Sequence, residues 1–267
     1  MTARDDPSNP WSRNTPASIG TTLWRSLMSR YCTNRYTPGV SGLREWSLRM
    51  THRGRAEMGR TAVKRTTVLA AGAFLVGGVT YLAAEAVAAL GWTDRPYSYS
   101  RNNISDLGIP DISPLHAVMN TGFVVDGTLF VLAGLGLAVL FEGRARWIVV
   151  GTSVVHGVGS IVVGLAHASV DGASTPHAVG AGMAIVGGNL VLLAAGRYGG
   201  RVAAPRWYTV SSATAGVAGL VGLALFLADT GILGGGTFER ISVYTIIGWE
   251  IVTGATILAK RRLSEVG

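Results

Sequence analysis

Hydroxyl, imidazole and carboxyl side chains recur along one apolar stretch of the sequence. In chain order they are Ser153, His156, Ser160, His167 and Asp171. At about 100° per residue, these positions lie on one stripe of a helix. Imidazole and carboxylate groups are adequate zinc ligands, so His167, Asp171 and the nearby His177 are candidate metal ligands. No HExxH or similar compact motif accompanies them, and a solvated mouth or polar helix ends would explain the same residues.

Four polar side chains interrupt apolar segments near their middles: Asp126, His156, Asn189 and Glu250. An ionisable group at the centre of a bilayer costs roughly 2.5 to 3.5 kcal/mol on insertion scales, so such groups face the interior of a bundle. Counting residues from the expected helix ends places all four at a similar depth and predicts one polar layer. Two interpretations remain. The layer is structural, with the acids neutral or hydrogen-bonded, or it is a proton relay or transport site at the midplane.

Six long apolar segments would position these residues. Each is close to the ~20 residues that a helix needs to cross a ~30 Å hydrocarbon core. Charged residues make up only 14% of the chain, against about 25% in soluble domains. We therefore predict an all-α fold, a polytopic bundle of six transmembrane helices within residues 66–262. The expected spans are 68–90, 115–140, 147–170, 177–195, 207–232 and 241–259.

Basic residues mark alternate ends of these expected spans. In chain order they are Lys64, Arg65, Arg144, Arg146, Arg197, Arg201, Arg206, Lys260, Arg261 and Arg262. The positive-inside rule places such segments in the cytoplasm, so both termini are expected there and the protein is expected in the plasma membrane. The other loops, which carry a mixed and mildly acidic set of residues, are expected outside.

Residues 1–65 form a basic N-terminal tail of different composition. They hold 12 of the 23 Lys and Arg residues and four of the 15 acidic residues, so the net charge of +8 belongs to this segment. It lacks a sustained apolar period and is expected to be disordered, or else to lie before a true start at Met50 or Met58. Its basic residues are scattered without a binding motif, which argues against a nucleic-acid partner. Residues 263–267 form a short C-terminal tail.

Two smaller observations concern a disulfide and a signal peptide. Cys32 is the only cysteine, which excludes an intramolecular disulfide. Residues 61–65 and the small residues Ala86, Val87 and Ala88 would fit a signal peptide and its cleavage site. However, an apolar run of about 20 residues is long for a signal peptide, whose apolar region has ~7 to 15, so we interpret it as a membrane span.

One loop segment and several helix ends resemble a known family. The loop reads Tyr99-Ser100-Arg101-Asn102-Asn103-Ile104-Ser105-Asp106-Leu107-Gly108, followed by Ser113-Pro114 and by Met119-Asn120-Thr121-Gly122-Phe123. Further matches are His177 with Gly180-Ala181, and Glu239-Arg240 with Tyr244 and Trp249. Over about residues 68–259 this combination resembles a prokaryotic membrane-protein family catalogued only as domain of unknown function 998 (DUF998). The resemblance implies a six-helix bundle in the plasma membrane and supplies no established activity.

The matched polar residues and the candidate ligands share the outer ends of the expected helices. This candidate outer-mouth site consists of Arg101, Asn102, Ser105, Asp106, His167, Asp171, His177, Glu239 and Arg240. It is either a network that closes the top of the bundle or a site for a lipid headgroup or small solute. Arg101 and Arg240 are expected to pair with Asp106, Asp171 or Glu239 across loops.

Three classes of function follow from these patterns. The first is a structural, lipid-binding or accessory membrane protein with a polar outer mouth. The second is a small-solute or proton-coupled transporter, and the third is an intramembrane metal-dependent lipid hydrolase that uses His156, His167, Asp171 and His177. Membrane lipids are the expected partners. The sequence assigns no cofactor, catalytic residue, substrate or oligomeric state.

Overall fold

The computed structural model describes residues 40–92, 96–169, 172–202, 204–228 and 233–266, with side chains between 57 and 262. Helices joined by loops make up this part of the chain. The long helices are α2 (Val40–Leu90), α3 (His116–Leu137), α4 (Gly143–Leu165), α5 (Thr175–Tyr198), α6 (Arg206–Leu227) and α7 (Gly235–Val266). Three short 3-10 helices join them: η1 (Ser105–Gly108), η2 (Ala138–Leu140) and η3 (Gly199–Val202). Within the described ranges there is no strand beyond an isolated bridge between Ser169 and Gly172.

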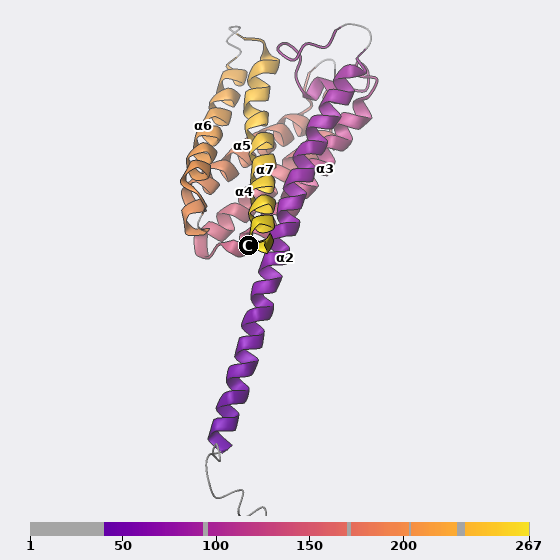
Figure 1. Ribbon diagram of the computed structural model, residues 1–267. Helices are drawn as coiled ribbons and strands as arrows, with labels where there is room; N and C mark the ends of the chain where they lie inside the picture. Colours follow the sequence, from indigo (N-terminus) through magenta and orange to yellow (C-terminus); the bar gives the residue numbers. More distant parts are fainter. Residues whose placement is uncertain (1–39, 93–95, 170–171, 203, 229–232, 267) are drawn as a thin grey trace, which may run out of the picture. The chain divides into compact units, whose positions relative to one another are not determined.

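Six of these helical stretches are long and apolar enough to cross a membrane: Glu57–Leu90, His116–Leu140, Gly143–Leu165, Thr175–Val202, Arg206–Leu227 and Gly235–Arg262. The all-α fold with six membrane-spanning helices is therefore confirmed. By its internal contacts the chain divides into two units, residues 1–56 and 57–267. The second unit contains all six spans and forms the helical bundle (Figure 1).

Local chemistry sets the ends of the helices. The Ser174 hydroxyl accepts a hydrogen bond from the backbone N–H of His177 and so caps the start of α5. Pro176 lies in the first turn, where a helix tolerates proline. Gly143 has a φ of +56°, which allows the chain to turn sharply into α4. The helix α4 ends at Leu165 rather than near residue 170. For α6, which ends at Leu227, residues 229–232 of the expected span lie outside the described residues.

The first helix begins earlier than its apolar pattern indicates. The helix α2 starts at Val40, so residues 40–65 are helical in the structure although the sequence indicated a disordered tail. Arg is the commonest residue in this stretch, which also contains Ala, Glu, Met and Lys, and all five have high intrinsic helix propensity. The apolar span can therefore propagate its helix backwards without a buried face, and residues 57–65 are indeed exposed. Residues 1–39 lie outside the described part of the chain.

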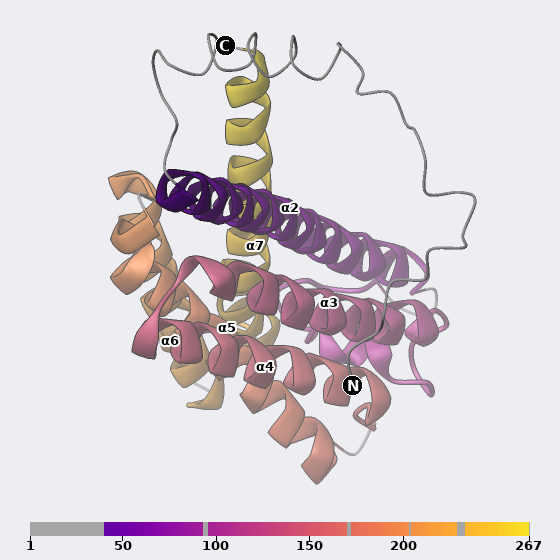
Figure 2. The same cartoon turned by 90° about the horizontal axis from the view of Figure 1, so that it is seen from below.

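The six spans pack as a ring. Consecutive helices from α3 to α7 contact one another, and α5 also touches α7 across the bundle. Figure 2 shows α3 and α4 lying side by side. The ring closes through α2, because Ala84 of α2 lies against Gly122 of α3 and the backbone of Ala71 lies against Gly254 of α7. Small residues permit this close approach where lipid supplies no hydrophobic driving force.

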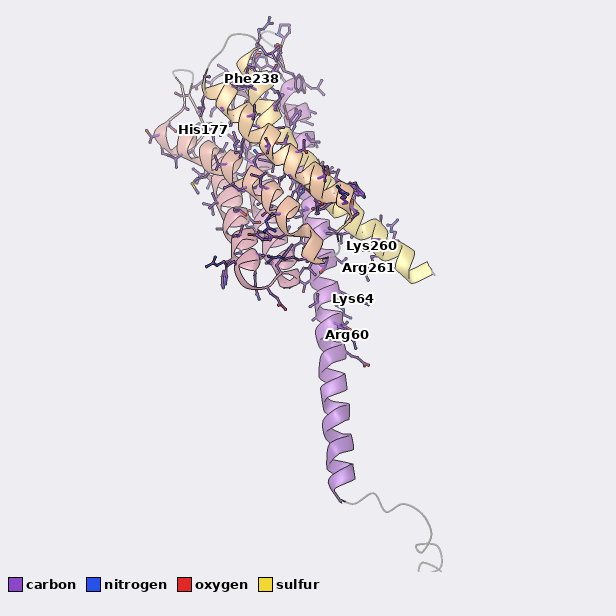
Figure 3. The ribbon with its side chains drawn as sticks, turned by 90° about the vertical axis from the view of Figure 1, so that its left-hand side faces the viewer. Arg60, Lys64, His177, Phe238, Lys260 and Arg261 are labelled. Carbon is purple, nitrogen blue, oxygen red and sulfur yellow. The ribbon has the colours of Figure 1, made fainter. Side chains whose placement is uncertain are left out.

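The bundle has two chemically different ends. Arg60, Lys64, Lys260 and Arg261 lie together at one end, which we call the basic end, whereas His177 and Phe238 lie toward the other (Figure 3). We call this other end the mouth; it is formed by residues 96–113 and the first turns of α5 and α7. An even number of spans returns the chain to the basic end, where the last span finishes at Arg262.

Two apolar clusters fill the interior of the ring. One contains Phe74, whose ring meets those of Phe130 and Trp249 edge to face. The other contains Tyr81 and Phe123, together with apolar residues of the segment that covers the mouth. Among the buried polar residues, Asp126, His156 and Glu250 are each less than 5% exposed.

Candidate functional site

Residues 96–113, which lie between α2 and α3 and which we call the covering segment, dock on the beginning of α7 and close part of the mouth. The backbone N–H of Ile104 donates to the Glu239 carboxylate, and the N–H of Thr237 donates to the Ser100 carbonyl at 3.1 Å. Gly236 makes the contact possible, because a β-carbon there would stand only 2.1 Å from the Asn102 carbonyl oxygen. Gly236, in the first turn of α7, is therefore needed for close backbone approach.

Arg240 holds this covering segment to the bundle. Its guanidinium donates two hydrogen bonds to Glu85 of α2, at 3.1 and 2.9 Å, and Arg240 is only 6% exposed. It also donates to three carbonyls, those of Tyr99 at 2.7 Å, Asn102 at 2.8 Å and Gly236 at 3.1 Å. Such charge-assisted bonds to a desolvated group are the strong kind, so Arg240 joins α2, α7 and the covering segment into one unit.

Aromatic side chains surround this guanidinium. Arg240 lies over the ring of Tyr99 at 4.8 Å and donates to the hydroxyl of Tyr97. Burial raises the pKa of the Tyr97 hydroxyl, although the Arg240 charge acts in the opposite direction. The phenol therefore stays protonated and donates to the Asn103 carbonyl at 2.8 Å. Tyr244 donates to the second oxygen of Glu85 at 2.9 Å, which completes the shell around that carboxylate.

The ion-pair partner expected for Arg240 at the mouth was wrong. Arg240 pairs with Glu85 and with neither Asp106 nor Glu239, because it faces the interior of the bundle, where Glu85 lies. The Arg101 guanidinium is exposed and forms no hydrogen bond or ion pair with any residue that the structure describes. Asp106 accepts a bond from the backbone N–H of Asn103 at 2.9 Å and thereby orders its own loop. Asp171 lies outside the described residues.

The remaining candidates at the mouth do not assemble into a ligand shell. His167 is exposed, whereas His177 is buried with its Nδ1 3.0 Å from the Ala166 carbonyl oxygen. The described residues contain no group of three or more His, Cys, Asp or Glu side chains that could hold a metal ion. Asn102 accepts a bond from the N–H of Ser98 at 3.0 Å, and this serves the loop. Ser105 and Glu239 instead line a cavity.

The structure brings three of the four midplane residues together. His156 Nε2 lies 3.9 Å from Asp126 Oδ2, and Nδ1 of the same imidazole lies 2.7 Å from the Ala184 carbonyl oxygen. A β-carbon at Gly77 of α2 would stand 3.2 Å from Asp126 Oδ1 and 3.6 Å from Glu250 Oε2, so both carboxyls reach the same point. Gly77 leaves the room that this acid pair occupies.

Asn189 belongs to a separate network. Its amide donates to the carbonyls of Ile185 at 2.9 Å and Ser242 at 3.0 Å, and its oxygen accepts from Thr245 at 3.0 Å. Both donors and the oxygen of this amide thereby have partners. Asn189 fixes α5 against α7, and the single four-residue layer indicated by the sequence divides into this amide network and an acid–imidazole cluster.

The acid–imidazole cluster, which consists of Asp126, His156 and Glu250, lacks hydrogen-bond partners. Both oxygens of Asp126, both oxygens of Glu250 and Nε2 of His156 are buried without one among the described residues. A buried polar atom without a hydrogen-bond partner is costly, and most buried polar atoms in native structures have one. These five atoms are therefore available to a proton, water or ligand.

A cavity of about 490 Å³ joins this cluster to the mouth. Ser105, His177 and Glu239 line its outer part, and Asp126 and His156 line its floor. Asp126 lies ten residues into α3, so the floor is ~15 Å below the start of that helix. The walls between are apolar and include Leu223 and Phe226 of α6. A second cavity of about 180 Å³ lies toward the basic end and contains none of the cluster residues.

Sequence reasoning did not assign Tyr81 to this site and did not pair Glu85 with Arg240. Tyr81 lines the cavity from α2, and Glu85 supplies the counter-charge for Arg240. A signal for the second was present, since Glu85 and Arg240 are opposite charges within expected spans. Nothing in the sequence marks Tyr81 apart from other aromatic residues in apolar helices.

One family model matches most of this bundle. The family is DUF998, described as a protein of unknown function, and the match covers residues 75–256. This confirms the resemblance noted in the sequence, and the matched range includes the cavity, the acid–imidazole cluster and Arg240. No curated protein and no solved structure matches the chain significantly.

Proposed function

We propose that this chain, which belongs to the DUF998 family of proteins of unknown function, binds a membrane-soluble amphipathic small molecule in the cavity between the mouth and Asp126. The observation that carries the proposal is one cavity with apolar walls and buried polar atoms without partners at its floor. Its volume of about 490 Å³ falls within the roughly 300 to 1,000 Å³ of small-molecule sites.

The chemistry of the cavity fits an amphipathic occupant. Most of the residues that line it are apolar, and its ionisable groups include His177 and Glu239 in the outer part and Asp126 and His156 at the floor. Val186 of α5 and Leu227 of α6 line the cavity and are themselves exposed on the bundle surface, Leu227 to 73%. A molecule dissolved in the bilayer could therefore enter between α5 and α6, where those helices meet lipid.

The polar residues of the mouth have a supporting role in this proposal. The covering segment takes up the hydrogen bonds of Arg240, Asn102 and Asp106. This supports a rigid entrance and not a second binding site. This corresponds to the interpretation of the mouth as a network that closes the bundle. The lipid-binding class is favoured over the hydrolase class, because the described residues offer no three-ligand group for a metal ion and Ser160 donates to the Phe123 carbonyl at 2.9 Å.

The distribution of charge supports an orientation for the cavity. Basic residues gather at the end where the first span begins and the last span finishes (Figure 3). If that end faces the cytoplasm, as the positive-inside rule predicts, the mouth opens toward the outside of the plasma membrane. The bound molecule would then come from the outer leaflet or the external medium.

Gly182 allows a direct test. It lines the cavity, and a β-carbon there would meet nothing within 4 Å. Gly182→Phe should therefore fill the cavity without displacing the helices. Gly248→Phe is a matched control, because Gly248 also has open space around its β-position, is exposed, and does not line the cavity.

The measurement is mass spectrometry of small molecules that co-purify with the protein after exhaustive detergent exchange. The wild-type chain and Gly248→Phe should retain an amphipathic molecule in near-stoichiometric amount, and Gly182→Phe should lose most of it. Equal retention in all three proteins would show that any bound molecule is annular lipid, and the proposal would fall.

A further inference from the structure

The acid–imidazole cluster has an imbalance of charge that its surroundings do not correct. Asp126 and Glu250 are 1% and 0% exposed, and their carboxyls meet beside Gly77. Within the six spans the one described basic residue on the mouth side is Arg240, and Glu85 already neutralises it. Burying two carboxylates without a counter-charge is very costly, so such groups bind protons or cations instead.

Counting charges gives the state of the empty cluster. With two carboxyls and one imidazole, neutrality requires two protons among the three groups. The Nδ1–H of His156 donates to the Ala184 carbonyl, so Nε2 faces Asp126 either as a bare lone pair or as an N–H of the imidazolium. The two protons are thus shared between Asp126, Glu250 and Nε2 of His156 as one coupled system.

The cavity gives a ligand access to part of this cluster. Asp126 and His156 line the floor, whereas Glu250 does not line the cavity and lies behind Asp126. The other titratable groups that line the cavity are Tyr81 of α2, His177 of α5 and Glu239 of α7. Glu239 is held by the backbone N–H of Ile104 at the covering segment, which leaves Asp126 as the acid at the floor.

We infer that the molecule bound in this cavity is a lipophilic organic cation, and that its positive charge replaces one proton of the Asp126–His156–Glu250 cluster. This inference rests on the proposed binding function and specifies its ligand class. When the cation binds, Asp126 is a carboxylate, one proton remains on the cluster, and the other proton leaves to the aqueous phase. The charge of the buried cluster with its ligand is zero before and after.

The exchange has a thermodynamic signature. One proton is released for each cation bound, so the dissociation constant should fall about tenfold for each pH unit over the range in which the empty cluster holds both protons. Above that range the affinity should become independent of pH. An anion of the same size and shape cannot replace a proton, so it gains nothing from the cluster.

Tetraphenylphosphonium and tetraphenylborate provide this comparison, because both are lipophilic and of similar size, carry opposite fixed charges and do not titrate. Binding is measured by isothermal calorimetry on the full chain in lipid nanodiscs at pH 6, 7 and 8, against empty nanodiscs. The wild-type chain should bind tetraphenylphosphonium saturably, with the expected pH dependence, and should not bind tetraphenylborate saturably. Asp126→Asn should weaken cation binding at least about tenfold and remove most of its pH dependence, whereas Asp111→Asn, at an exposed position, should do neither.

Different failures point to different parts of the proposal. Saturable binding of both ions, or cation binding that ignores pH in the wild-type chain, overturns the inference and leaves amphiphile binding intact. The wild-type pH dependence decides the matter even if Asp126→Asn does not fold. No saturable binding of the cation also overturns the inference, and the proposed function then depends on the Gly182→Phe result alone.

Discussion

Breaking the buried pair between Glu85 and Arg240 is the most informative perturbation of the fold around the site. Arg240 is 6% exposed and Glu85 is 2% exposed, and the two side chains share two hydrogen bonds of 3.1 and 2.9 Å. Glu85→Gln keeps the shape of the side chain and removes its charge. The guanidinium cannot release its proton, so it is left buried without a counter-charge. Losses of about 3 to 5 kcal/mol in unfolding free energy are typical of such changes.

A double-mutant cycle separates the pair from its surroundings. Glu85→Gln and Arg240→Gln should each destabilise the bundle, but the double variant should lose less than the sum, because neither charge remains unpaired. Coupling energies of residues in direct contact reach about 0.5 to 3 kcal/mol, and we expect this pair near the upper end.

Unfolding free energies are measured by titration with sodium dodecyl sulfate from dodecyl maltoside micelles, followed by tryptophan fluorescence. Arg101→Gln is the control, since the Arg101 side chain is exposed at the same end of the bundle and has no described partner; the substitution should change stability by less than about 0.5 kcal/mol. Additive losses in the cycle, within about 0.5 kcal/mol, would refute the view that this pair locks the mouth.

Three further predictions concern the cluster, the tail and the topology. Asp126→Leu should raise the melting temperature, because it removes one of two buried carboxyls that have no partner outside their own cluster; a clear drop would mean that Asp126 stabilises the folded protein through that cluster. Deleting residues 1–56, which form a unit separate from the bundle, should leave the melting temperature unchanged, and loss of folded protein would contradict the division into two units. Reporter fusions after Arg146 should be cytoplasmic and those at Asp106 external, and a reversal would overturn the proposed orientation.

The number and place of the helices were accessible from the sequence for a simple reason. A helix that crosses a bilayer needs about 20 consecutive apolar residues, and such a run can be recognised in the sequence itself. The same regular rise put Asp126, His156 and Glu250 at a common depth, and the structure brings these three together. Depth along a helix follows from counting residues.

The partners of the polar residues were less accessible, because they depend on how each helix is rotated and which helix lies beside it. Arg240 faces Glu85, which is 155 positions away in the sequence, and Asn189 faces Ser242 and Thr245 of α7. No periodicity encodes which of several buried carboxylates a guanidinium meets. The cavity could not be predicted either, since it is defined by where side chains fail to fill the space between the six spans.

The most direct test of ligand binding is an experimental structure of the full chain in lipid nanodiscs at a resolution that shows side chains, with tetraphenylphosphonium present at pH 8. We predict density for the bound cation inside the cavity, between Asp126 at the floor and Ser105 at the mouth, with its charged centre toward Asp126 and Arg240 still paired with Glu85. A well-resolved cavity that is empty, or density confined to the outer surface of the helices, would contradict this function.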